Sequence, residues 1–231
     1  DGIILGKFHS LINPGGRIPQ WITALTGIDD SMVKDAPRFH EIAAPLKEFL
    51  QRGVFVAHNA PFDHSFIQAE FGRLGQAWDA NRLCTVRMAR HVFPDLPSRS
   101  LGNLCEHLLI EIFGRHRAAG DAEATVYVLK HCLQLFRKNY GVVTWGDLER
   151  CLSIGPLKLP DGVTLKHIDT LPDGPGKYVL KDELGETVHQ GRSKNVRTCI
   201  RRLFRASNRS EKALRFRKVV RGIEGVASTA N

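Results

Sequence analysis

The chain has 231 residues, of which 42% are hydrophobic, and it carries a formal net charge of +9. This length fits two small domains better than one large one, and no apolar run reaches the 18 or so residues of a membrane span, so we expect no membrane partner. The five cysteines are odd in number and form no C-x-x-C pair, which favours a reduced, cytoplasmic setting over a disulfide framework or a zinc site.

The first half of the chain predicts an α/β domain. An extended segment over residues 3–12 ends at the turn cluster NPGG. A helix is expected after Pro37, and the short apolar run over residues 54–57 predicts a buried strand. That strand delivers His58 and Asn59 to its carboxyl end, where open α/β sheets place their sites. Further helices are expected over residues 61–74, 85–92, 101–109 and 121–138, the last with Val126, Leu129, Leu133 and Phe136 facing inward.

Two short blocks carry candidate chemistry. The block HNAPFD ends at Asp63, and the block HRAAGD places His116 and Asp121 in H-x4-D spacing. A carboxylate can hold a divalent cation, and an imidazole with a pKa near neutrality can take a proton from an attacking water. The pattern suggests a metal-dependent phosphodiesterase site.

Five blocks follow one another along the chain: LINPGGRIP, ITALTGIDDSMV, HNAPFD, LPSRSLGNLCEHL and HRAAGD. In this order they resemble the DEDDh 3'-5' exonucleases, typified by the epsilon subunit of bacterial DNA polymerase III. The resemblance covers about residues 1–137 and implies a ribonuclease H-like exonuclease domain. It implies His116 as general base, Asp63 and Asp121 as metal ligands, and His58, Asn59 and Phe62 beside the substrate. The family site holds two Mg2+ or Mn2+ ions about 3.5–4 Å apart, and its other two carboxylates come from an Asp-x-Glu pair on the first strand.

The chain departs from the family at its start. Asp1 aligns with the turn before the family's third strand, and no Glu follows two residues on. We therefore expect that the N-terminus is cut, that the first strands are missing, and that a half site remains, with weak metal binding and little activity as given. For the parent protein we expect hydrolysis of phosphodiester bonds at single-stranded or frayed 3' ends of DNA. Its place would be in proofreading beside a DNA polymerase or in a repair complex.

Purely structural roles stay open for three of these residues. Asp63 fits a helix-first-turn carboxylate favoured by the macrodipole. His58 fits a strand-end residue that hydrogen-bonds the backbone, and Phe62 fits a packing residue as well as one that stacks on a base.

The composition of the chain changes after about residue 141, and from there to residue 176 Pro and Gly residues are interleaved. We expect an exonuclease domain over residues 1–150, a linker over 151–172 and a second domain over 173–231. Residues 1–155 hold 17 Lys and Arg against 16 Asp and Glu, whereas residues 156–231 hold 16 against 8. This asymmetry predicts phosphate contacts in the C-terminal third, although a solvated basic surface would have the same composition.

The segment GPGKYVLKDELGETVHQGRSKNVRTCIRRLF resembles the start of a GIY-YIG nuclease domain, the kind found in the bacterial excinuclease, and implies a small α/β fold. Residues 176–178 stand at the GIY position and residues 189–191 at YIG, with two strands meeting at a Leu184-Gly185 turn and a helix after them. The DNA-contact candidates are Tyr178, His189, Arg192, Lys194, Asn195, Arg197 and Arg201, followed by Arg202 and Arg205. Tyr178 fits a packing role equally well.

The second resemblance also has departures. His189 stands where the family has its second tyrosine, Cys199 stands where it has the catalytic arginine, and its metal-binding Glu would fall after Asn231. We therefore expect a degenerate nuclease fold, partial in this chain and kept for DNA contact. The alternative to an exonuclease is accordingly a non-catalytic nucleic-acid-binding module, and the two classes are discriminated by whether an Asp-x-Glu strand is encoded upstream of Asp1.

Overall fold

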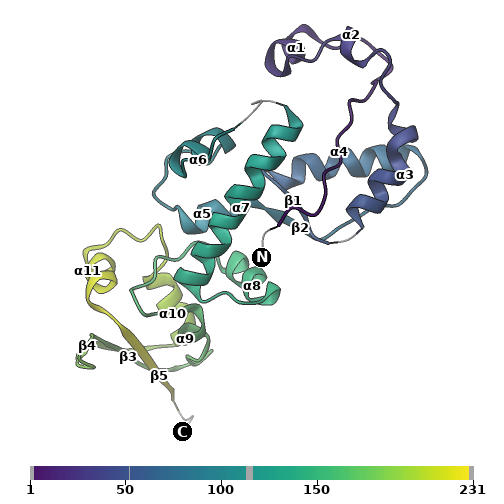
Figure 1. Cartoon of the computed structure of the whole chain (residues 1–231). Coiled ribbons are helices and arrows are strands. Elements are labelled where there is room, and N and C mark those ends of the chain that lie inside the picture. The colour runs from purple at the N-terminus through teal and green to yellow at the C-terminus, as the bar shows by residue number, and fades with distance from the viewer. Residues whose placement is uncertain (1–2, 52, 113–116, 229–231) are drawn as a thin grey trace. The chain divides into compact units, whose positions relative to one another are not determined.

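The computed structural model describes residues 3–51, 53–112 and 117–228, and the chain forms two compact units (Figure 1). The first unit comprises Asp1–Arg87 and Ser98–Lys130. The second comprises Met88–Pro97 and His131–Asn231.

The first unit is built around two parallel strands joined by a helix. Strand β1 (Phe55–Ala57) pairs in parallel with β2 (Arg82–Cys84), and α4 (Ala60–Arg73) connects them and packs against both. Helix α3 (Phe39–Leu50) supplies the apolar face that the spacing predicts, with Ala43 buried in a cluster with Phe71 and Trp78. The predicted helix after Pro37 and the predicted strand are therefore confirmed.

The extended segment over residues 3–12 lies outside any strand. Ile3 and Leu5 are 75% and 96% exposed. Among the residues described, the segment has no strand beside it to accept its backbone hydrogen bonds. Its contacts come instead from side chains, with Phe8 packed against Phe49 at 5.8 Å between ring centroids. Two short helices follow, α1 (Gln20–Thr26) and α2 (Asp30–Val33).

Three more helices lie where the sequence pattern places them: α5 (Thr85–Val92), α6 (Leu101–His107) and α7 (Ala118–Tyr140). The inward face expected for α7 is partly wrong, because Leu133 is 40% exposed. The buried residues follow a four-residue spacing instead: Ala124, Val128, Cys132, Phe136 and Tyr140. Each four-residue step exceeds a full turn by about 40°, so this buried stripe winds gradually around the helix from Ala124 to Tyr140.

The second unit is a three-stranded antiparallel sheet with helices packed against it. The strand order is β4-β3-β5, formed by β3 (Gly176–Lys181), β4 (Thr187–Ser193) and β5 (Gly222–Ala227). The predicted pair of strands and the predicted helix after them are present, the helix being α10 (Val196–Leu203). Further helices are α8 (Trp145–Ile154), α9 (Leu165–Asp169) and α11 (Glu211–Val219).

Two glycines lie opposite Tyr178 in the middle of this sheet, and side chains pack closely on both. Tyr178 lies opposite Gly191 on β4 and opposite Gly225 on β5. A Cβ atom at Gly191 would lie 2.6 Å from the Tyr178 hydroxyl oxygen, and one at Gly225 would lie 2.9 Å from a methyl carbon of Leu171. Only glycine lets the aromatic ring and the loop pack this closely on the backbone.

The segment over residues 151–172, expected as a linker, holds the end of α8 and all of α9. Its apolar side chains are buried, with Leu157 and Val163 each 3% exposed and Ile168 fully buried. The two compact units divide the chain at other positions, so the boundaries drawn from the sequence stay a prediction.

Candidate functional site

His58 is held by both of its ring nitrogens at the carboxyl end of β1. Nδ1 lies 2.9 Å from Oγ1 of Thr85, and Nε2 lies 2.9 Å from the backbone oxygen of Arg99. A carbonyl oxygen only accepts, so Nε2 carries the hydrogen and Nδ1 accepts from the threonine hydroxyl. Burial lowers the pKa of His58, against the raising effects of the Arg99 carbonyl and of the Asp121 charge. The neutral imidazole therefore fits the strand-end role.

Asp63 lies in the first turn of α4, five residues after His58. Burial raises the pKa of its carboxyl, and the hydrogen bond with its own backbone N–H acts in the opposite direction. A desolvated carboxylate of this kind is stabilised by a nearby cation. The role of Asp63 as a metal ligand and its role as a first-turn helix carboxylate both stay predictions.

Asp121 occupies the matching place in α7, in the first helical turn. Its charge acts on His58, so this carboxylate belongs to the same region as the end of β1. Its backbone is fixed on both sides, with its N–H donating to the Arg117 oxygen and its carbonyl accepting from the Thr125 hydroxyl. His116, the expected general base, lies outside the described residues.

The remaining expected substrate residues lie between His58 and Asp63. Asn59 adopts a left-handed backbone, with φ 78°, and directly precedes α4. Phe62 is 58% exposed, and its ring lies 4.8 Å from that of Phe66, which is equally exposed. An exposed aromatic pair suits stacking on a base at least as well as packing.

The described residues contain no group of three or more His, Cys, Asp and Glu side chains that could hold a metal ion. Asp63 and Asp121 are two carboxylates, and a two-ion site needs more ligands than two.

The same described residues also contain no helix long and apolar enough to cross a membrane.

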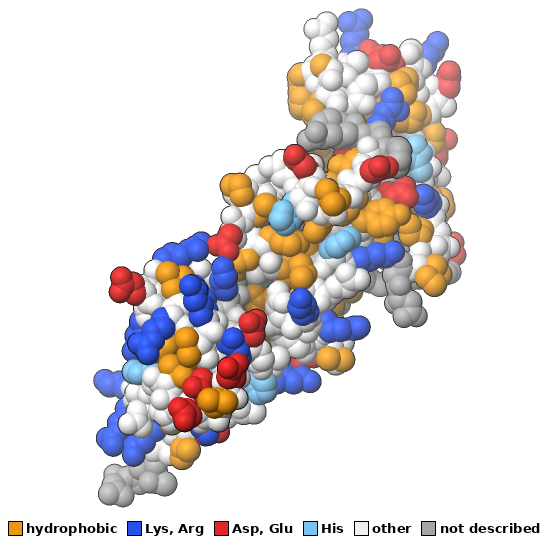
Figure 2. Space-filling model, turned by 60° about the vertical axis from the view of Figure 1, so that its left-hand side comes forward, with side chains coloured by type: hydrophobic (Ala, Val, Ile, Leu, Met, Phe, Trp, Pro, Cys, Tyr) orange, Lys and Arg blue, Asp and Glu red, His pale blue; other side chains and the backbone are white. Residues whose placement is uncertain are grey.

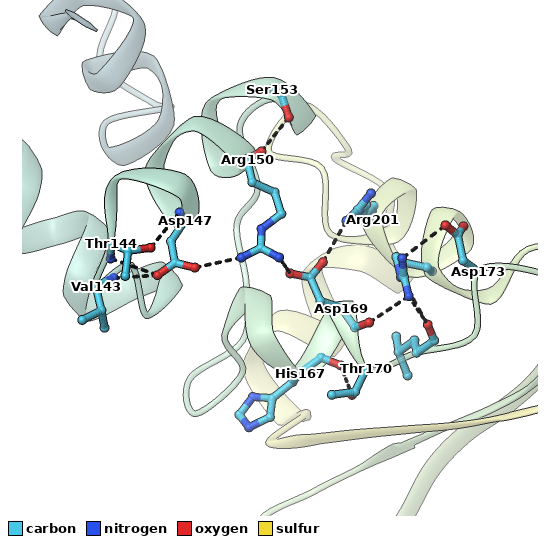
Figure 3. A network of polar contacts seen from close by, with 12 residues as sticks. Val143, Thr144, Asp147, Arg150, Ser153, His167, Asp169, Thr170, Asp173 and Arg201 are labelled. Atoms are coloured by element: carbon cyan, nitrogen blue, oxygen red, sulfur yellow. Dashed lines mark hydrogen bonds and ion pairs between the residues drawn. The ribbon is translucent and has the colours of Figure 1, made fainter. Parts of the chain in front are cut away.

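In the second unit, Arg197 has a structural role. Its side chain donates to the backbone oxygens of Asp169 and Leu171 at 2.8 and 2.9 Å and to the Asp173 carboxylate at 3.2 Å. Arg201 pairs with the Asp169 carboxylate at 2.9 Å (Figure 3). Both arginines therefore tie α10 to α9, and Arg197 also ties it to the loop after α9. Their expected phosphate contacts stay a prediction.

A chain of charges continues from Asp169 into α8 (Figure 3). Arg150 contacts the Asp169 carboxylate at 3.3 Å and the Asp147 carboxylate at 2.8 Å. Backbone N–H groups of Thr144 and Val143, with smaller help from Arg150, lower the pKa of Asp147 to about 2. Sequence reasoning missed this network because its members are spread over 55 positions, from Asp147 to Arg201.

The other expected DNA contacts differ in exposure. Asn195 caps α10, with its side-chain oxygen accepting from the Thr198 N–H at 2.8 Å. Tyr178 is 7% exposed, and burial raises the pKa of its hydroxyl, which also hydrogen-bonds Cys199. Arg192 and Lys194 are exposed, so they remain suited to phosphate contact, whereas Tyr178 has mainly a packing role.

His189 lies beside two cations of α11 that the sequence pattern did not single out. Its Nε2 lies 3.1 Å from the Lys212 ammonium. Burial lowers the pKa of His189, and the charges of Lys212 and Arg215 lower it further. The signal that could have found these cations is their three-residue spacing, which puts both on one side of a helix.

Comparison with known proteins gives matches over both halves of the chain. The model of the Exonuclease family matches residues 1–129. A Mycobacterium tuberculosis protein described as a bifunctional exonuclease/endonuclease is 34% identical over 216 residues, 91% of this chain. The PolC-type DNA polymerase III of Caldanaerobacter subterraneus is 40% identical over 131 residues, 57% of this chain. The chain spans 33% of the former relative and 9% of the latter.

Among solved structures, exonuclease X in complex with 5' overhanging duplex DNA matches with a TM-score of 0.52 at 22% identity. The match covers 66% of this chain and 84% of that one. At this identity the likeness concerns the fold, which is the mixed α/β fold of an exonuclease. Since the family model also covers more than half of the sequence and includes Asp63 and Asp121, the chain belongs to the exonuclease family.

Proposed function

We propose that the protein to which these residues belong is a metal-dependent 3'-5' exonuclease acting on DNA, with a ribonuclease H-like exonuclease domain over residues 1–150. One observation carries the proposal. Asp63 and Asp121 come from separate sequence blocks and each lies in the first turn of a helix; Asp63 follows His58 by five residues, and the Asp121 charge acts on His58. The exonuclease X match supports DNA as the substrate class.

Each residue has a distinct part in this proposal. Asp63 and Asp121 would be ligands of Mg2+ or Mn2+, and the bound ions supply an activated water and stabilise the leaving oxygen. His116 would take the proton from that water. His58, locked between Thr85 and Arg99, would hold the strand end in place, while Phe62 would stack on a base near the 3' end. The proposal requires the Asp-x-Glu pair that the family resemblance implies.

The test uses the protein with the coding sequence upstream of Asp1 included. Asp121→Asn should abolish release of mononucleotides from a 3'-labelled oligonucleotide while DNA retention persists. Glu123→Gln is the matched control, because Glu123 lies on the same helix but pairs with Lys7 at 3.2 Å. If Asp121→Asn digested DNA at the parent's rate, the assignment of Asp121 to the metal would be wrong.

His116→Ala should lower turnover by roughly 10²–10⁴-fold, with a smaller effect on binding. The pH–rate profile should lose its limb near neutrality. An unchanged profile in this variant would make His116 a structural residue.

A second candidate function is favoured by the charge of residues 156–231. We propose that the second unit is a GIY-YIG-like domain that contacts DNA without cutting it, since Cys199 stands at the position of the family's catalytic arginine. Support comes from the hairpin of β3 and β4 followed by α10, and from the relative described as an exonuclease/endonuclease, which matches nearly the whole chain. This domain tilts the proposed role from proofreading beside a polymerase to repair.

One measurement on the full-length protein separates the exonuclease from the alternative, a non-catalytic nucleic-acid-binding module. If no Asp-x-Glu strand is encoded upstream and the protein binds DNA without shortening it, the non-catalytic module is the right interpretation. Shortening of the 3' end that depends on Mg2+ or Mn2+ and on Asp121 supports the exonuclease.

A further inference from the structure

Several cations of the second unit form ion pairs with acidic side chains. Lys158 and Arg209 both contact Asp95, at 2.8 and 2.6 Å. Lys181 contacts Glu224 at 2.6 Å. The arginines of the network around Asp169 are paired in the same way.

Lys212 and Arg215 of α11 lie outside these ion pairs. Both side chains are exposed, and within the described part of the chain neither has an acidic partner. Both charges act on the same imidazole, that of His189 on β4. Two cations directed at a neutral ring without a counter-charge leave a local excess of positive potential, which an anion would neutralise. On the face shown in Figure 2, Lys and Arg side chains also gather over the C-terminal part of the chain.

The tautomer of His189 follows from its contact with Lys212. An ammonium group has donors and no acceptor, so the 3.1 Å contact requires an unprotonated Nε2 and places the hydrogen on Nδ1. Nδ1–H points out of the other side of the ring, so the part of His189 in this cluster is to fix the Lys212 ammonium through Nε2. The ring itself is held in place by Phe216, whose centroid lies 5.2 Å away, and by Tyr178 at 6.1 Å.

The Lys212 ammonium is positioned as well. It lies 5.6 Å from the centroid of the Phe216 ring, in a cation–π contact, while it donates to His189. Phe216 is 4% exposed and anchors α11 to the core of the unit. The donors are thus presented by a packed helix and a paired strand rather than by free chain ends.

From these contacts we propose that Lys212 and Arg215 form a binding site for a phosphate group, with His189 holding Lys212 in position. Lys212 and Arg215 supply the charge and the donors, and the His189 ring reports on the site because it contacts the Lys212 ammonium. This inference extends the proposed DNA contact of the second unit and names the side chains that make it. The phosphate is either the phosphodiester of a nucleic-acid backbone or a terminal phosphate.

The test observes His189 directly in the full chain. Inorganic phosphate is titrated at constant ionic strength, with chloride as the balancing anion, and the imidazole resonances of His189 are followed by NMR. We expect a saturable shift. Lys212→Gln and Arg215→Gln should each weaken the affinity by about tenfold or more, because each removes a charge-assisted contact. Lys218→Gln, which makes the same charge change further along α11, should leave the affinity unchanged.

Two oligonucleotides then separate the sources of phosphate. One is a short oligothymidylate without terminal phosphate, and the other is the same strand with a 5' phosphate. Equal binding of the two, lost in Lys212→Gln, supports a backbone phosphodiester as ligand, while binding of only the second supports a terminal phosphate. If His189 shows no saturable shift with inorganic phosphate or with either strand, or if Lys212→Gln and Arg215→Gln bind like the parent, the proposal is overturned.

The exonuclease proposal fails or stands separately. Asp121→Asn removes the proposed metal ligand from the first unit and should leave the phosphate response of His189 unchanged. Persistent cutting by Asp121→Asn with an intact His189 response shows that the exonuclease proposal has failed, and loss of cutting in a protein whose His189 never responds to phosphate shows that the phosphate-site proposal has failed.

Discussion

Replacing Arg197 by alanine should weaken the second unit without removing a DNA contact. The guanidinium donates to the backbone oxygens of Asp169 and Leu171, and the arginine side chain is only 24% exposed. Hydrogen bonds to a charged group contribute about 1.5–3 kcal/mol each. The pair with Asp173 adds little, because that carboxylate is 63% exposed. Since the two carbonyl contacts share one guanidinium and are not additive, we expect a loss of about 2–4 kcal/mol.

The assay measures the opening free energy of α10 by native-state amide hydrogen exchange, which reports on this region rather than on the whole chain. Arg192→Ala is the matched control. Arg192 lies five residues earlier in the same basic segment but is exposed on β4, so its loss should change stability by less than about 0.5 kcal/mol.

DNA binding should show the opposite pattern for the two variants. Arg192→Ala should reduce the salt dependence of DNA affinity by roughly one unit if Arg192 contacts a phosphate. Arg197→Ala should leave the salt dependence unchanged under conditions where the variant is folded. If Arg197→Ala instead kept its exchange protection and lost about one unit of salt slope, Arg197 would be a phosphate contact and the structural role assigned to it would be refuted.

Three further predictions concern the packing of the sheet and the pH dependence of stability. Gly191→Ala should destabilise by about 1–3 kcal/mol, because its Cβ would lie 2.6 Å from the Tyr178 hydroxyl, whereas Gly174→Ala, with nothing within 4 Å, should be neutral; equal urea midpoints for the two variants would contradict this. Asp63→Asn should stabilise the fold at pH 7. Burial raises the pKa of Asp63, so native stability falls as pH rises from the unfolded-state pKa through the folded-state pKa. The gain from the substitution should vanish below about pH 4, and a gain that is constant with pH would count against this reasoning. His58→Gln should reduce the loss of stability that occurs as pH falls from 7 to 5. Burial lowers the pKa of His58, so the unfolded chain binds the proton at a higher pH than the native chain does. If the pH dependence of the thermal unfolding temperature were unchanged in this variant, His58 would not contribute.

The sequence by itself was enough to determine the family and part of the local elements. Helices α3 to α7, the β1 strand and the hairpin of β3 and β4 follow from patterns within a few residues of one another. The blocks around Asp63 and Asp121 are equally local, and they led to the exonuclease family. Such signals survive because the periodicity of apolar residues and the chemistry of turns act over short distances along the chain.

The tertiary structure alone decided which polar side chains are already engaged. Arg197 and Arg192 belong to one basic segment, yet Arg197 is bound by carbonyl groups 26 and 28 positions away, and Arg192 is exposed. The two ring nitrogens of His58 are likewise held by Thr85 and Arg99, at 27 and 41 positions away. Composition counts charges and motifs place residue types, but a hydrogen bond is decided by which distant backbone atoms the fold brings within about 3 Å. That is why a single basic stretch divides into arginines that hold the fold together and cations that stay available to a ligand.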